Sequence, residues 1–114
     1  MDYNVEVFTP QYYEKWHEKE IQRELEAIPN GKYVRFKEEY PESVILFRIG
    51  DFYETYAEDA HTCADILGIA LNKANTNNVK KMYRYCGFPK HELNDYLYKM
   101  VRAGKKVCVC EPIK

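Results

Sequence analysis

The segment Val44 to Ile49, VILFRI, carries an apolar side chain at every position except Arg48. Successive side chains of a β-strand point to opposite faces of the sheet, so both faces of this segment are apolar. A strand of this kind is buried on both sides, which is typical of a central strand with helices packed over its two faces. We therefore predict a covered central strand that ends at Gly50.

Helical periodicity marks the segments that would cover such a strand. A helix is expected from Pro10, which Thr9 can cap, to the turn formed by Pro29, Asn30 and Gly31. Its apolar stripe has roughly helical spacing and consists of Tyr13, Trp16, Ile21, Leu25 and Ile28. Similar patterns predict three more helices, over Lys32 to Tyr40, over about Glu58 to Leu67, and between Pro89 and Gly104.

Three further strands complete the pattern. They are predicted at Ile69 to Asn72, Met82 to Phe88 and Lys106 to Cys110. Lys73 to Lys81 has no apolar period and is expected to be a mobile loop or a hairpin tip. The resulting order, helix-helix-β-α-β-β-α-β, predicts an α/β fold with a small mixed β-sheet flanked by helices.

Composition limits the classes of protein to which the chain can belong. A chain of 114 residues that is 46% hydrophobic can bury one compact core. The net charge of −1 is not that of a protein held to nucleic acid by bulk electrostatics. No apolar run approaches the ~20 residues of a membrane span and nothing resembles a signal peptide, so no membrane partner is expected. The four cysteines form no C-x-x-C pair, which argues against a zinc site and favours a reducing, cytoplasmic setting; no cofactor is predicted.

The four residues that follow Gly50 place two aromatic rings between two carboxylates. Asp51 is expected to form a turn, and Tyr53 is the better core candidate of the two rings. Phe52 is either a core ring or a ring held out to touch a partner, and alternation does not decide between these because Gly50 interrupts the register. Glu54 either caps the first turn of the next helix or contacts a ligand.

Three stretches of this sequence resemble the N-terminal mismatch-recognition domain of the MutS family of DNA mismatch repair proteins. They are FRIGDFYETYAEDA, ADILGIALNK and CGFPKHELNDYLYKMVRAGKKVCVCEPI. The resemblance covers about Lys32 to Ile113 and implies that family's fold. We expect residues 1–31 to be an added helical extension and residues 32–114 to be the MutS-like domain.

The resemblance implies roles for two residues. Phe52 matches a phenylalanine that wedges beside a mispaired base from the minor groove, and Glu54 matches a glutamate that hydrogen-bonds that base. An aromatic face can stack on any base, and unstacking costs less where pairing is already faulty. A carboxylate repels phosphate, so Glu54 would penalise ordinary duplex and act on selectivity.

Basic residues around the loop offer contacts for the DNA backbone. Lys73, Lys80, Lys81 and Arg84 are plausible phosphate contacts, although the same residues can equally be a solvated surface. The expected DNA-binding residues are therefore Phe52, Glu54 and these four.

The expected function is that of a DNA-binding module for mispaired or distorted duplex, without catalysis. No G-x-x-x-x-G-K-[ST] loop is present, so no Walker-type ATP site is predicted, and no nucleophile–base pair or metal cluster is visible. The alternative is a protein-interaction or regulatory module that reuses the fold and binds through exposed aromatics. The N-terminal helix would then hold a protein partner or a second copy of the chain.

Overall fold

The computed structural model describes residues 2–3, 9–75 and 82–113. Its centre is a five-stranded sheet in the order β3-β4-β2-β1-β5. The strands are β1 (Ser43–Ile49), β2 (Phe52–Tyr56), β3 (Asn72–Asn75), β4 (Met82–Pro89) and β5 (Lys106–Cys110). β1 pairs with β2 in the antiparallel sense and with β5 in the parallel sense, so the sheet is mixed and β1 is an interior strand, as predicted.

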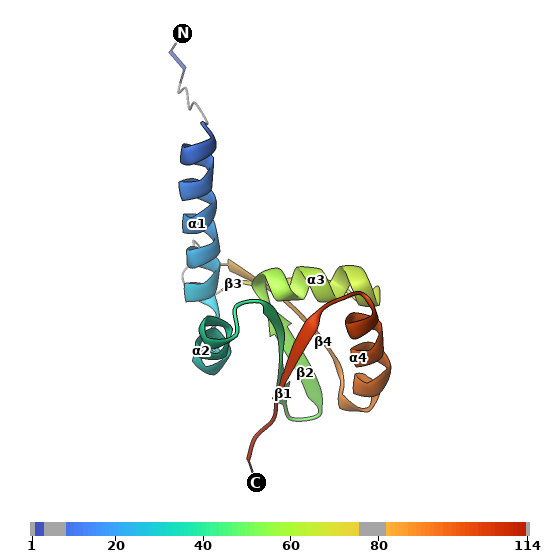
Figure 1. Cartoon of the computed structure of the whole chain (residues 1–114). Coiled ribbons are helices and arrows are strands. Elements are labelled where there is room, and N and C mark those ends of the chain that lie inside the picture. Colours follow the sequence, from blue (N-terminus) through green and yellow to red (C-terminus); the bar gives the residue numbers. More distant parts are fainter. Residues whose placement is uncertain (1, 4–8, 76–81, 114) are drawn as a thin grey trace.

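Two helices cover one face of the sheet, which we call the α3/α4 face. They are α3 (Ala57–Leu67) and α4 (Leu93–Arg102), the latter preceded by the 3-10 turn η1 (Lys90–Glu92). The core between helices and sheet consists of Val44, Leu46, Tyr53, Ala60, Cys63, Leu67, Cys86, Phe88 and Met100. Figure 1 shows α3 running across the sheet and α4 beside it.

The opposite face, which we call the α2 face, is only partly covered. The helix α2 (Gly31–Glu39) and the end of α1 (Pro10–Ala27) pack there. The buried members of this second cluster are Ile28, Tyr33, Ile45, Tyr56 and Ala57. Both faces of β1 are thus buried because Leu46 belongs to one cluster and Ile45 to the other.

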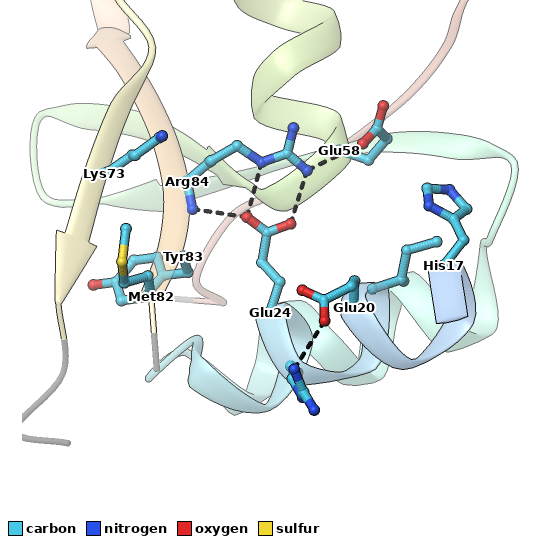
Figure 2. Close-up of a pocket in the computed structure, with 10 residues that line it drawn as sticks. His17, Glu20, Glu24, Glu58, Lys73, Met82, Tyr83 and Arg84 are labelled. Atoms are coloured by element: carbon cyan, nitrogen blue, oxygen red, sulfur yellow. Dashed lines mark hydrogen bonds and ion pairs between the residues drawn. The ribbon is translucent and has the colours of Figure 1, made fainter. Parts of the chain in front are cut away.

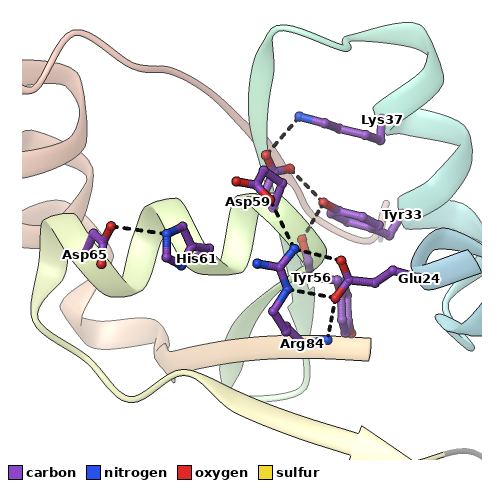
Figure 3. Close-up of polar contacts among 9 residues, drawn as sticks. Glu24, Tyr33, Lys37, Tyr56, Asp59, His61, Asp65 and Arg84 are labelled. Atoms are coloured by element: carbon purple, nitrogen blue, oxygen red, sulfur yellow. Dashed lines mark hydrogen bonds and ion pairs between the residues drawn. The ribbon is translucent and has the colours of Figure 1, made fainter. Parts of the chain in front are cut away.

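A buried carboxylate joins the two layers. Asp59 of α3 accepts hydrogen bonds from the Tyr33 hydroxyl at 2.7 Å and from the backbone N–H of Ile45 at 3.2 Å. Its other oxygen accepts from Lys37 Nζ at 2.8 Å (Figure 3). Burial and the nearby Asp59 raise the pKa of Tyr33. The hydroxyl therefore remains a donor, and α2, β1 and α3 are tied together through one side chain.

The structure corrects two expectations for the strands. The chain does not leave the sheet after Gly50, because Gly50 adopts a φ of 61° and a tight turn returns Phe52 to Tyr56 to the sheet as β2. The third strand lies at Asn72–Asn75 and not at Ile69 to Asn72. β3 is an edge strand that pairs only with β4, so it needs no apolar face, and hydrophobicity misplaced it.

The first helix is docked at its C-terminal end and extends away from the body elsewhere. Figure 1 shows α1 standing out from the sheet with its N-terminal end farthest away. Ile28, just past the helix, is buried, Leu25 packs against the α2-face cluster, and Ile21 is 42% exposed. The side chains of Tyr13 and Trp16 lie outside the described part of the chain. No helix within residues 2–3, 9–75 and 82–113 has the length and apolar character needed to cross a membrane.

Candidate nucleic-acid interface

Phe52 and Tyr53 are neighbours on β2 with opposite environments. Tyr53 points to the α3/α4 face and is 3% exposed, as expected for a core ring. Phe52 points to the α2 face, next to Ile49, and is 51% exposed. The core interpretation of Phe52 is therefore wrong, because about half of the residue's surface meets solvent at the start of β2.

The turn that carries Phe52 is held in place by backbone and side-chain contacts. Phe52 pairs with Ile49 on one side and with Pro89 on the other. The Lys90 N–H donates to the Asp51 carbonyl at 2.8 Å, and Lys90 Nζ lies 3.3 Å from Asp51 Oδ1. These contacts fasten the β1–β2 turn to η1, so the exposed ring sits on a fixed support.

Tyr53 anchors the same strand from the opposite face. Its ring lies 5.8 Å from that of Phe88, and its hydroxyl donates to Glu111. Burial, the hydrogen bond and the charge of Glu111 together raise the pKa of Tyr53. Arg48 lies 3.9 Å from the same carboxylate and donates from Nε to the Gly50 carbonyl at 3.1 Å. The contacts of Tyr53 therefore hold β2 in place, and β2 carries the exposed Phe52.

Glu54 lies on the α2 face, the same face as Phe52, and the capping reading is wrong because Glu54 is inside β2. Gly87 pairs opposite Glu54, and a Cβ there would lie 3.0 Å from the Tyr53 carbonyl oxygen and 3.3 Å from Glu54 Cγ. The Tyr56 hydroxyl donates to Glu54 Oε2 at 2.7 Å. Burial and this carboxylate raise the pKa of Tyr56, so its hydroxyl keeps its proton. Gly87 therefore leaves room for the Glu54 side chain, and the Tyr56 hydroxyl orients its carboxylate.

A hollow of about 440 Å³ opens beside Glu54 on the same face. Its lining combines the turn before α2 with β1, β2, β3 and β4 and consists of Pro29, Asn30, Ile49, Glu54, Tyr56, Ala74, Tyr83 and Tyr85. Sequence reasoning missed the three tyrosines as site residues. The signal was present in MYRYCGF, where Tyr83 and Tyr85 alternate onto one face of a strand.

The predicted basic contacts lie elsewhere. Lys73 pairs opposite Arg84, and the alternation along β4 puts Arg84 on the α3/α4 face with Cys86, away from Phe52. Phe52 pairs with Pro89, five residues along β4 from Arg84, a separation of roughly 17 Å along the strand. Lys80 and Lys81 lie outside the described residues. The structure therefore does not bring Lys73 and Arg84 together with Phe52 and Glu54.

Arg84 is bound within the chain by two carboxylates. Its backbone N–H and Nε donate to Glu24 Oε2, each at 2.9 Å, and Nη2 donates to Glu24 Oε1 at 2.8 Å. The same Nη2 lies 3.1 Å from Glu58 Oε2 (Figure 2). Arg84 thus joins α1 and the start of α3 to β4, a link that the sequence did not predict.

The interaction between Glu24 and Arg84 favours the ionised form of both side chains. Burial alone would raise the pKa of Glu24, but hydrogen bonds and charge from Arg84 outweigh it and hold that pKa below its usual value of 4.5. The hydrogen bonds to Glu24 and Glu58 raise the pKa of Arg84 against the opposing effect of burial. Lys73 lines the adjoining hollow of about 340 Å³, which Figure 2 shows from the side of α1.

The described residues contain no group of three or more His, Cys, Asp or Glu side chains arranged to hold a metal ion. Of the cysteines, Cys63 and Cys86 are buried and Cys108 and Cys110 are half-buried, and all four are free thiols. His91 is exposed in η1.

One family model and three relatives show which known proteins this chain resembles. The family model for MutS domain I matches residues 30–114. The DNA mismatch repair protein MutS of Porphyromonas gingivalis is 43% identical over 83 residues, which cover 73% of this chain and 9% of that protein. The protein of the same name from Phocaeicola vulgatus is 46% identical over 83 residues, with the same coverage of 73% and 9%. That of Flavobacterium psychrophilum is 40% identical over 93 residues, covering 81% of this chain and 11% of the relative. The chain thus spans about a tenth of the length of these curated relatives.

Proposed function

Because this chain belongs to the MutS domain I family, we propose that it binds duplex DNA at mispaired or distorted sites. The relatives that contain a similar segment are named DNA mismatch repair protein MutS, which supports a DNA-binding role for this domain. We assign no catalytic step and no ATP hydrolysis to these residues. The proposed function is recognition.

The observation that carries this proposal is the exposed ring of Phe52. A large apolar side chain that is 51% exposed, on a turn fastened to η1, has little role in the core. Such a ring can enter the minor groove between base pairs, where it replaces part of the stacking that it disrupts. The cost of unstacking is lower at a mispair, so the wedge favours faulty sites over regular duplex.

Glu54 adds selectivity to the same surface. It lies two residues from Phe52 on the same face of β2, so both side chains meet the same region of a bound duplex. A carboxylate near phosphates is unfavourable, and only a base that offers a proton donor offsets that penalty. We therefore expect Phe52 to supply binding and Glu54 to supply discrimination.

The test compares Phe52→Ala with the unaltered chain. Fluorescence anisotropy would measure binding to a duplex with one mispair and to the matched perfect duplex, and thermal melting would measure stability. Because Phe52 stacks on DNA and contributes little to the core, Phe52→Ala should bring mispair binding down to the perfect-duplex level. Stacking is worth roughly 1–3 kcal/mol per base, so the affinity for the mispaired duplex should fall by about 5- to 150-fold.

The matched control is Tyr98→Ala, which removes another exposed ring, from α4. It should leave both affinities unchanged. A Phe52→Ala chain that keeps its preference for the mispair would exclude the wedge. A chain that instead loses several kcal/mol of stability, as large core truncations do, would return Phe52 to the core.

A protein-interaction role is the second candidate, and one observation favours it. The N-terminal part of α1 extends away from the sheet (Figure 1), in the position of an arm that a protein partner or a second copy of the chain could hold. The two roles are compatible because α1 and Phe52 lie on different parts of the molecule.

A further inference from the structure

A groove of about 500 Å³ lies between α2 and the edge strand β5, and we call it the α2/β5 groove. Its floor includes Phe36, Phe47 and Cys110, which pack at the margin of the α2-face cluster. The rings of Phe36 and Phe47 are half-buried, with centroids 6.3 Å apart at 37°. Burial raises the pKa of Cys110, so this thiol stays neutral and adds to the apolar floor. The groove is thus an apolar surface that is open beside the last strand of the sheet.

The strand β5 also has an open backbone edge. It pairs with β1 on one side, and no strand of the described residues pairs with its other side. The segment Val107 to Cys110 reads VCVC and carries no charge. An apolar edge strand of this kind is a template for pairing with a further strand. Because Val109 and Cys110 also line the groove, an extended segment in the groove would lie next to this edge.

The rim of the groove is basic. Lys32 and Arg35 of α2 line it, both are exposed, and neither forms an ion pair within the described part of the chain. The acid among the described lining residues is Glu111. Its carboxylate already accepts the Tyr53 hydroxyl and lies 3.9 Å from Arg48. The groove therefore suits an occupant that is extended, apolar and acidic.

The N-terminal segment of this chain has that character. Residues 2–8 read DYNVEVF, and residues 4–8 lie outside the described part of the chain. Period-two alternation is typical of an extended strand, and the odd-numbered positions here are apolar, namely Tyr3, Val5 and Val7. The segment carries the acids Asp2 and Glu6, and no basic side chain precedes Lys15.

This segment cannot lie along the groove of its own chain. α1 has 18 residues and is therefore roughly 27 Å long. Residues 2–9 would span at most about 26 Å when fully extended, so a segment folded back along α1 would end near the docked end of that helix. The groove continues from there to Ile113. Figure 1 shows the N-terminal end of α1 and the C-terminal residues on opposite sides of the sheet. The groove that the segment can enter belongs to another copy.

We propose that residues 2–8 of one copy lie in extended form along β5 of a second copy, with their apolar side in the α2/β5 groove. The inference develops the second candidate role of α1 and does not depend on DNA binding. α1 carries the segment away from the body of its own chain, and Tyr3 is 76% exposed there. If two copies exchange their segments reciprocally, the assembly closes as a symmetric dimer.

An apolar, acidic peptide from another protein is the competing occupant. The segment of a second copy is favoured because it combines the alternation, the negative charge and the projecting support in one chain. Self-association of the purified chain separates the two, since a groove reserved for another protein would leave this chain monomeric.

The first experiment measures sedimentation velocity of the full chain over a range of concentrations. The unaltered chain should associate as its concentration rises. Val5→Asp places a charge on the apolar side of the segment and should weaken association about tenfold or more, as expected when a buried valine is lost. The matched control Asn4→Asp adds the same charge at the preceding position, on the other side of the alternation, and should not weaken association.

Two outcomes of this experiment would overturn the proposal. One is a chain that stays monomeric at every concentration. The other is equal association of the Val5→Asp and unaltered chains, which would place the contact between copies elsewhere.

A charge reversal tests the receiving groove. Arg35→Glu puts an acid on the rim and should weaken association several-fold, because it repels the acidic segment. The matched control Arg102→Glu makes the same reversal on the exposed side of α4, over the opposite face of the sheet, and should leave association unchanged. Equal association of the Arg35→Glu and Arg102→Glu chains would exclude the α2/β5 groove.

The native thiols locate the contact. Alkylation by iodoacetamide, followed by peptide mass spectrometry, gives the reaction rate of each cysteine. Cys110 should react several-fold more slowly in the associated chain than in the dilute chain, because the segment covers it. In Val5→Asp the rate should not depend on concentration. The buried Cys63 and Cys86 serve as internal references that react slowly in every sample. A Cys110 rate that ignores association in the unaltered chain would overturn the proposal.

The Phe52→Ala chain separates this inference from the proposed function. Phe52 is outside the lining of the groove, so this chain should associate as the unaltered chain does, whatever its DNA binding. Loss of mispair preference in Phe52→Ala with normal association supports both proposals. Normal association in a chain that shows no preference for a mispair means that the proposed function is wrong and the groove contact stands. Mispair preference in a chain that never associates means the reverse.

Discussion

Glu54 places a negative charge on the surface that we propose binds DNA. Replacing it with alanine removes both a hydrogen-bond acceptor and a negative charge. Binding to perfect duplex should therefore hold or rise, binding to a mispaired duplex should fall, and the ratio of the two affinities should shrink about tenfold. Anisotropy titrations at one salt concentration measure that ratio.

Glu42→Ala is the control for this prediction, since it removes the same charge from an exposed turn. It should raise both affinities slightly and leave their ratio unchanged. An unchanged ratio in Glu54→Ala would mean that Glu54 takes no part in discrimination.

Glu24 makes stability depend on pH. Its folded-state pKa lies below the usual 4.5, so the pair with Arg84 contributes stability above that value and loses it as the pH falls toward the folded-state pKa. Glu24→Gln should lower the free energy of unfolding by about 1–3 kcal/mol near neutral pH, a range between exposed and buried ion pairs. The two chains should converge as the pH falls below 4.5 toward the folded-state pKa of Glu24.

Urea unfolding at several pH values measures this difference. Glu26→Gln, on the exposed side of the same helix, is the control and should follow the unaltered chain at every pH. A constant gap between Glu24→Gln and the unaltered chain down to acid pH would contradict the linkage.

At single residues, the sequence predicted what depends on local pattern and missed what depends on register or distance. Tyr53 was identified as the core ring and Phe52 was left open. The face of Phe52 depends on the length of the turn at Gly50, because a shift of one residue moves every side chain to the other face. Arg84 was predicted as a phosphate contact because its partner Glu24 is 60 positions away in the chain, beyond any local pattern.

At the scale of elements, the docked and projecting parts of α1 should separate in their effects. Deleting residues 1–19 removes the part that Figure 1 shows extending from the body and should leave the melting temperature nearly unchanged. Deleting residues 1–28 also removes Glu24 and the buried Ile28, and should cost about 3 kcal/mol or more. Differential scanning calorimetry measures both.

Sedimentation velocity of the same two truncated chains tests the interaction role of α1. If the N-terminal part of the helix holds a second copy of the chain, deletion of residues 1–19 should lower the sedimentation coefficient at high concentration. Equal melting temperatures in the two truncations would contradict docking through Ile28 and Glu24.

Long periodic elements were predictable, and elements fixed by pairing were not. The four helices and the strands β1, β4 and β5 were found within a few residues because each carries an apolar pattern. β2 was missed because its alternation begins directly after the turn, and β3 was displaced because its residues are polar. Both β2 and β3 form by backbone hydrogen bonding to β4, and local hydrophobicity does not reveal this pairing.

The whole molecule is elongated and nearly neutral. Its radius of gyration is 16.3 Å, above the roughly 13 Å of a compact domain of this length, and its longest extent is 60 Å. The projection of α1 accounts for this shape (Figure 1). With a net charge of −1 and with Arg84 engaged by carboxylates, the chain offers DNA phosphates little positive charge.

We therefore expect weak, salt-tolerant DNA binding. The dissociation constant for perfect duplex should lie at the weak end of about 10⁻⁴–10⁻⁶ M, and the slope of log K against log salt should be no steeper than about −3, as for a few phosphate contacts. Titrations of labelled duplex at several salt concentrations give both values. Nanomolar binding, or a slope as steep as that of proteins with many phosphate contacts, would contradict this account.

The pairing of Arg84 with Glu24 also has a consequence for competition. Because both residues belong to one chain, Glu24 acts as an intramolecular ligand whose effective concentration at the guanidinium is far higher than that of free DNA. A phosphate from solution would have to displace this tethered carboxylate before it could reach Arg84. The guanidinium of Arg84 is therefore already occupied by the Glu24 carboxylate. Binding of a DNA phosphate to Arg84 would depend on how readily α1 detaches from β4.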